Sequence, residues 1–145
     1  MRSGMLFLLL FGLSAAAAVA QVRKTLDIYV VDVEGGNAVL FVTPSGESML
    51  IDSGNGGTAA VRDAERILAA SKDAGLTQID HLITTHYHGD HIGGLAELAT
   101  RIPIKEFIHH GPNTQPNAAT DAFLQGGYRD LYTKTKLDAH VRPPA

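Results

Sequence analysis

The sequence contains no cysteine, so disulfide bonds and thiolate zinc sites are excluded. A lipid anchor on a cysteine after the apolar N-terminal segment is excluded for the same reason. The sequence also lacks a basic excess, with 12 Lys and Arg against 15 Asp and Glu. This balance gives no electrostatic footprint for binding a nucleic-acid backbone. Repeats and interdomain linkers are absent too, and the length suits about one domain.

The first 20 residues differ in composition from the rest. Arg2 provides a positive start, residues 5–13 are apolar, and Ala18-Val19-Ala20 forms a small-x-small cleavage site. This layout is typical of a secretory signal peptide, whereas an uncleaved anchor needs about 20 apolar residues. We therefore expect residues 21–145 to form the mature chain, with 11 basic and 15 acidic residues. We expect this chain in the periplasm or outside the cell, without a membrane association.

The mature chain predicts an α/β fold. Alternating apolar residues and turn signals predict three strands over 26–33, 37–43 and 48–52, joined as an antiparallel meander. Helical periodicity follows from Val61 to Ser71 and ends at Gly75. A strand over 79–84, a helix over 92–102 and a strand over 104–108 come next. Residues 111–117 suggest a loop, and residues 124–135 suggest a further helix.

Four potential metal ligands lie at the end of the predicted strand 79–84: His86, His88, Asp90 and His91. Residues two apart in extended backbone point to the same side, so the first two can bind one ion. Gly89 would permit a sharp turn that brings the other two close. Imidazole nitrogens with a carboxylate suit Zn²⁺, and Fe or Mn is possible.

The alternative interpretation of this stretch is a polar loop that happens to be rich in histidine. The other four histidines are isolated, and we interpret them as ordinary structural or surface residues. They are His81, His109, His110 and His140. No structural role requires three histidines and an aspartate in this arrangement, so metal binding is the favoured interpretation of residues 86–91.

The cluster resembles the signature of the metallo-β-lactamase superfamily, and its context does too. A strand ends in Asp52-Ser53-Gly54, a helix follows, and the helix after the ligand motif begins with Gly93-Gly94. The resemblance covers about residues 26–110. Residues 32–38 resemble the branch that includes the hydrolase domain of bacterial competence channels. That branch usually has aspartate-valine-glycine-glutamine-glycine-aspartate, from which this chain departs at Glu34 and Asn37 and also at Gly35.

This resemblance implies the αββα sandwich of the superfamily, of which the chain would form the N-terminal half. It implies that His86 and His88 bind a first zinc ion, and that Asp90, also catalytic, and His91 bind a second. It also implies that Asp52 lies beneath the site and orients it by hydrogen bonds. An aspartate after a strand can equally serve a turn, and both interpretations of Asp52 stay open.

The resemblance further implies an exported zinc-dependent hydrolase, in which a metal-bridging hydroxide attacks an ester, amide or phosphodiester. Its substrate would be a small molecule or a phosphodiester. A metal-binding regulatory protein without activity is the alternative. The family's remaining ligands lie well downstream, and His140 is the only later histidine. We therefore expect residues 21–145 to be a C-terminally truncated, inactive fragment of the domain.

Overall fold

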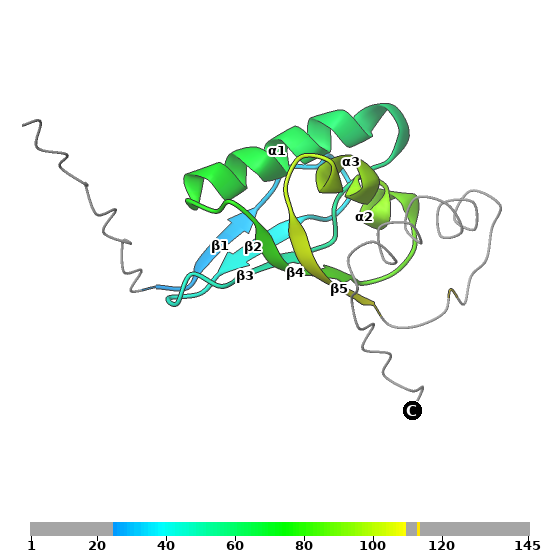
Figure 1. Cartoon of the computed structure of the whole chain (residues 1–145). Helices are drawn as coiled ribbons and strands as arrows, with labels where there is room; N and C mark the ends of the chain where they lie inside the picture. The colour runs from blue at the N-terminus through cyan, green and yellow to red at the C-terminus, as the bar shows by residue number, and fades with distance from the viewer. Residues whose placement is uncertain (1–24, 110–112, 114–145) are drawn as a thin grey trace, which may run out of the picture.

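The computed structural model of the chain describes residues 25–109 and 113. In this part, five strands form one mixed sheet in the order β1-β2-β3-β4-β5 (Figure 1). The strands are β1 (Asp27–Val30), β2 (Val39–Val42), β3 (Ser48–Ile51), β4 (Ile79–Thr84) and β5 (Ile104–His109). The helices are the 3-10 helix η1 (Gly57–Ala59) and the α-helices α1 (Ala60–Asp73), α2 (Gly89–Ile92) and α3 (Leu95–Ala99).

Several predictions concern segments outside the described residues. These are the signal peptide over 1–20, the loop over 111–117, the helix over 124–135 and the position of His140. The domain boundaries are therefore still predictions. None of the helices over residues 25–109 has the length and apolar character needed to cross a membrane.

The sheet changes from antiparallel to parallel pairing at β3. The strands β1, β2 and β3 pair antiparallel, which confirms the predicted meander. The strands β3, β4 and β5 then pair parallel. Parallel neighbours need a crossover connection, and α1 provides it between β3 and β4. The predicted α/β class is confirmed, and the C-terminal ends of β3, β4 and β5 lie at one edge of the sheet.

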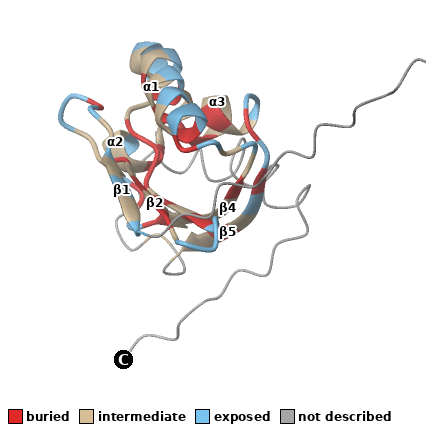
Figure 2. Ribbon diagram, turned by 90° about the vertical axis from the view of Figure 1, so that its left-hand side faces the viewer, coloured by how far each residue is buried: buried red, intermediate tan, exposed pale blue. Residues whose placement is uncertain are grey.

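One face of the sheet carries the core. Helices α1 and α3 lie over this face, and the buried residues gather between them and the strands (Figures 1 and 2). A row of apolar side chains crosses four paired strands here: Leu40, Leu50, Leu82 and Phe107. All four are at most 1% exposed. Each buried leucine stabilises the fold by roughly 1.5–3 kcal/mol.

Helix α1 follows the predicted amphipathic pattern except in its first turn, where Val61 is exposed and Asp63 is buried. Ala64, Ile67 and Ser71 face the core, and Gly75 ends the helix with a φ of +71°. The amide of Leu76 donates to the carbonyl of Ser71 at 2.8 Å, and Leu76 packs against the core. This is the Schellman arrangement, which satisfies carbonyl groups left over at a helix end.

The predicted continuous helix over 92–102 is wrong, because the chain forms α2 and α3 instead. The bonds that would join them are diverted to other segments. The Asp90 carbonyl accepts from the Asn37 amide at 3.1 Å, and the His91 carbonyl accepts from the Ser53 amide at 2.7 Å. The Gly94 amide donates to the Gly54 carbonyl. Tertiary hydrogen bonds therefore replace the helical ones at Gly93-Gly94.

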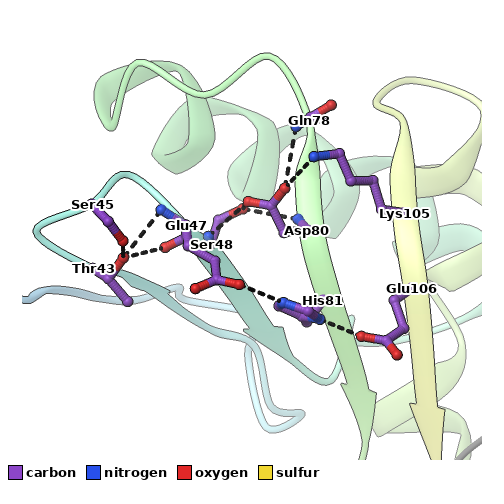
Figure 3. A network of polar contacts seen from close by, with 9 residues as sticks. All are labelled: Thr43, Ser45, Glu47, Ser48, Gln78, Asp80, His81, Lys105 and Glu106. Carbon is purple, nitrogen blue, oxygen red and sulfur yellow. Dashed lines mark hydrogen bonds and ion pairs between the residues drawn. The ribbon is translucent and has the colours of Figure 1, made fainter. Parts of the chain in front are cut away.

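A polar network lies at the opposite end of β4 from His86 (Figure 3). His81 lies between two carboxylates from neighbouring segments. Its Nε2 is 3.0 Å from Glu47 Oε1, and its Nδ1 bonds Glu106. Asp80 accepts from both the amide and the hydroxyl of Ser48 at 2.9 Å. These contacts account for His81 as a structural residue, in line with its interpretation from the sequence.

The ion pairs of His81 predict a pH-dependent stability. Its hydrogen bond to Glu47, with a further contribution from Glu106, raises its pKa above the ordinary value. The stabilisation is therefore complete below about pH 6.5 and is lost as the pH rises through the raised pKa. We expect His81→Gln to lower the free energy of unfolding at about pH 5.5 and to change it little at about pH 8.5.

Urea unfolding of the parent chain and the variant with a metal chelator present measures this difference. The other histidines titrate in both proteins. Only the gap between the two free energies of unfolding, and its change with pH, therefore reports on His81. An equal gap at both pH values would contradict the assignment.

Candidate metal centre

The first two candidate ligands lie on the loop between β4 and α2. The ring centroids of His86 and His88 are 4.6 Å apart. The Nε2 of His86 lies 3.1 Å from the Nδ1 of His88. Tyr87, between them, points the other way and is buried, as expected for alternation in extended backbone. Both histidines therefore present nitrogen atoms to one point.

The other two candidates lie on the first turn of α2. The Nε2 of His91 is 3.7 Å from Asp90 Oδ2. The ring centroid of His91 is 3.9 Å from that of His86, so the two pairs are neighbours. The described residues thus bring all four predicted ligands to one place, at the end of β4. Their binding of metal stays a prediction.

The donor atoms fit metal ions as pairs. No group of three or more His, Cys, Asp or Glu side chains within residues 25–109 and 113 is arranged to hold an ion. Two nitrogens that bind one tetrahedral zinc ion lie about 3.4 Å apart, given bonds of about 2.0–2.1 Å. The separations of 3.1 Å for His86 with His88 and 3.7 Å for Asp90 with His91 are close to this value. The two donor atoms of each pair can therefore occupy two of the four coordination positions of one zinc ion.

The protonation of His86 also favours metal binding. Burial lowers its pKa, and the positive charges of His91 and His88 lower it further. A lower pKa favours the neutral imidazole, which is the form that binds a metal ion.

Asp52 lies directly beneath this cluster and is 1% exposed. It follows β3 with a φ of +60°, in the left-handed region that non-glycine residues rarely adopt. Its Oδ2 is 2.8 Å from the Nδ1 of His91. Because a carboxylate only accepts hydrogen bonds, Nδ1 carries the proton and Nε2 has a free lone pair. Such a carboxylate contact is the common means of orienting a metal-binding histidine.

Three other hydrogen bonds hold the Asp52 carboxylate. Oδ1 accepts from the Thr85 amide at 2.8 Å. Oδ2 accepts from the Thr85 hydroxyl at 2.7 Å and from the Asn37 side-chain amide at 2.9 Å. These contacts match the orienting arrangement that the resemblance implies, and they join three separate segments of the chain.

Asn37, Thr85 and Tyr87 also contribute to the site, although the sequence alone did not indicate this. The Tyr87 hydroxyl lies 3.0 Å from the Nδ1 of His109 at the end of β5, and burial raises the pKa of Tyr87. Alternation along extended backbone places Tyr87 on the opposite side from His86 and His88, which is the signal in the sequence that it points inward. Nothing local in the sequence indicated its partner, because that contact is made across the sheet.

The predicted role of Gly89 is wrong. Its φ is not positive, and a Cβ there would meet no atom within 4 Å. The close approaches are at other glycines. A Cβ on Gly36 would lie 2.2 Å from the Asp90 carbonyl oxygen, and one on Gly93 would lie 2.1 Å from the Gly56 nitrogen. Packing against neighbouring backbone, not a turn at Gly89, therefore places Asp90 and His91.

The contact between Asp52 and His91 predicts the effect of Asp52→Asn. In the variant, the side-chain oxygen at position 52 must accept the hydrogen bond of the Thr85 amide, so the NH₂ group at this position faces His91. His91 must then accept at Nδ1 and carry its proton on Nε2, which removes its lone pair. We expect the affinity for the second metal ion to fall by about 10–100-fold.

Zinc titration by calorimetry measures this change. Asp80→Asn is the matched control, since Asp80 is also a hydrogen-bonded aspartate at a strand end but lies at the other end of β4. Equal zinc affinity in the Asp52→Asn variant and the parent would rule out the orienting role.

Comparison with known proteins agrees with this fold. Residues 31–128 match the family model described as the metallo-beta-lactamase superfamily. The chain therefore belongs to the metallo-beta-lactamase superfamily. A solved metallo-beta-lactamase of Cronobacter sakazakii, a mutant with the HARLDQ motif, has the same fold with a TM-score of 0.50 and 24% identity. That match covers 69% of this chain and 34% of the solved chain.

Two curated relatives show how much of a whole protein the chain represents. It is 33% identical over 110 residues to the Anti-Pycsar protein Apyc1 of Bacillus phage BSP38, covering 70% of this chain and 39% of that protein. It is 39% identical over 67 residues to a hydroxyacylglutathione hydrolase of Xanthomonas euvesicatoria pv. vesicatoria, covering 46% and 23%. The chain thus spans well under half the length of these relatives.

Proposed function

We propose that the chain carries the metal-binding half of the active site of a metal-dependent hydrolase. The observation that carries this proposal is the meeting of two donor pairs at the end of β4, with Asp52 hydrogen-bonded to His91. His86 and His88 would hold a first divalent ion, and Asp90 and His91 a second, with zinc the best match to the donors. Relatives named as hydroxyacylglutathione hydrolases support hydrolysis as the reaction class.

A bound zinc ion would supply a Lewis acid and lower the pKa of water to about 7. The chain's own residues have preparatory roles. Burial lowers the pKa of His86, which favours the neutral form, and the Nδ1–H of His91 donates a hydrogen bond to Asp52. Tyr87 anchors the loop to β5 through His109. Together they would hold the metal-binding atoms in place before a substrate arrives.

The substrate class follows from a panel of hydrolysis assays with zinc-loaded protein. Bis(p-nitrophenyl) phosphate tests phosphodiesters, nitrocefin tests β-lactams, and a hydroxyacylglutathione thioester tests the reaction that the Xanthomonas relative's name describes. Because the chain spans well under half the length of its relatives, we expect turnover of one of these from the full-length protein, lost on chelation and restored by zinc. Bound zinc without turnover of any by the full-length protein would favour a metal-binding regulatory protein, and absence of zinc binding would overturn the proposal.

We also propose that the protein is exported and that residues 1–20 are removed. The support is the apolar segment followed by Ala18-Val19-Ala20. Mass spectrometry of the product from the expressing cells should give an N-terminus at Gln21 in the periplasm or the medium. Retention of residues 1–20 in a membrane fraction would contradict export with cleavage.

A further inference from the structure

Asn37 is linked to both predicted ligands of the second ion, to Asp90 directly and to His91 through Asp52. Its backbone amide donates to the Asp90 carbonyl at 3.1 Å. Its side-chain NH₂ donates at 2.9 Å to Asp52 Oδ2, the same oxygen that lies 2.8 Å from the Nδ1 of His91. These hydrogen bonds therefore act on the pair formed by Asp90 and His91.

The turn that carries Asn37 is held in place by other residues. Glu34 forms ion pairs with Arg62 at 2.6 Å and Arg66 at 3.1 Å, which fasten the turn to α1. Asn55 donates its side-chain amide to the Val33 carbonyl at 2.6 Å. The Asn37 side chain is thus not required to fix the turn, and it is free to serve Asp52.

The contacts of Asp52 favour a hydrogen-bond donor at position 37. Oδ2 of Asp52 already meets the Thr85 hydroxyl and the His91 ring, and a third contact at 2.9 Å must also donate. An aspartate here, as in the branch that residues 32–38 resemble, would oppose two carboxylates unless a proton were shared. Opposed carboxylates this close cannot both stay ionised in place.

We propose that Asn37 is a positioning residue, whose side-chain amide holds the Asp52 carboxylate against His91 and so prepares the second metal position. This inference rests on the proposed metal-dependent function. It adds a residue that acts through Asp52 without contacting the metal or the substrate. It also explains why a departure at position 37 is compatible with a working site.

Two variants separate this role from a role in packing. Asn37→Ala removes the donor, whereas Asn37→Asp keeps the shape and places an acceptor against Asp52. A positioning role by hydrogen bonding makes the aspartate variant the more damaging, and a role in shape alone makes the alanine variant the more damaging. We expect the affinity for the second ion to fall by at least about 10-fold in Asn37→Asp and by less in Asn37→Ala.

The matched control is Gln78→Glu. The Gln78 side-chain amide donates to Asp80 Oδ1 at 3.2 Å, so this variant also places one carboxylate against another (Figure 3). Asp80 lies near the start of β4, whereas the candidate ligands follow the end of that strand. We expect an unchanged His91 ring.

The measurements use the full chain. Nitrogen-15 spectra of the histidine rings, recorded without metal and assigned by a His91→Gln variant, should show the Nδ1-protonated form in the parent and in Gln78→Glu. Asn37→Asp should shift the His91 signals away from that form. An unshifted His91 in Asn37→Asp, an equal shift in Gln78→Glu, or greater damage from Asn37→Ala would each overturn the proposal. If the parent binds no zinc, the proposed function fails, and these spectra still decide the role of Asn37.

Discussion

Gly93→Ala is expected to destabilise the protein by about 3 kcal/mol or more, at the upper end of the range for overpacked sites. The added Cβ would lie 2.1 Å from both the Gly56 nitrogen and the Gly89 carbonyl oxygen. Both are backbone atoms, so no side chain can rotate away to relieve the clash. The loop after β3 must then separate from α2, which also moves Asp90 and His91 relative to Asp52.

Gly89→Ala provides the matched comparison four residues earlier. Its Cβ would meet nothing within 4 Å, and it occupies the first residue of α2. Alanine is favoured over glycine in helices by up to about 1 kcal/mol, so stability should be unchanged or slightly higher. Urea unfolding of both variants measures the difference. Equal stabilities would mean that Gly56 and Gly93 are not in close contact.

The second large effect concerns the two donor pairs. In the full-length protein, His86→Ala should impair binding at the first metal position, and Asp90→Ala should empty the second while the first stays largely occupied. Each change removes a direct ligand, so the affinity of that position should fall by more than about 100-fold, since even indirect partners cost about 10–100-fold. His81→Ala is the matched histidine control, because His81 lies at the far end of β4.

Metal analysis after dialysis against limiting zinc gives the stoichiometry of each variant. One ion fewer in Asp90→Ala, with parent stoichiometry in His81→Ala, is the expected pattern. If His86→Ala and Asp90→Ala both bind as much zinc as the parent, the cluster over 86–91 is not the metal site.

Elements that depend on local pattern could be predicted from the sequence. The meander of β1 to β3 follows from period-two alternation and turn residues, and α1 follows from helical periodicity ending at Gly75. The ligand cluster was also evident, because His86, His88, Asp90 and His91 lie within six positions of one another. In each case the information lies within a few residues, where backbone geometry alone relates the side chains.

The predictions that are wrong concern contacts between segments distant in the sequence. The predicted helix over 92–102 had the correct apolar periodicity, since Ile92, Leu95 and Leu98 are buried. Its interruption depends on Asn37 and on the loop after β3, which take the hydrogen bonds that the helix would use. The predicted role of Gly89 is wrong for the same reason, because the segment that packs against a glycine decides whether a side chain would fit there.

The mixed pairing of the sheet also has a consequence for the order of folding. The strands β1 to β3 join residues close in sequence, and such contacts form quickly at a small cost in chain entropy. The contacts of Asp52 with Thr85 and His91 instead span 33 and 39 residues, across the α1 crossover. The early meander therefore contains none of the predicted ligands. Asp52 reaches Thr85 and His91 only after β4 has docked on β3. The orientation of His91 by Asp52 therefore arises late in folding and distinguishes native chains from partly folded ones.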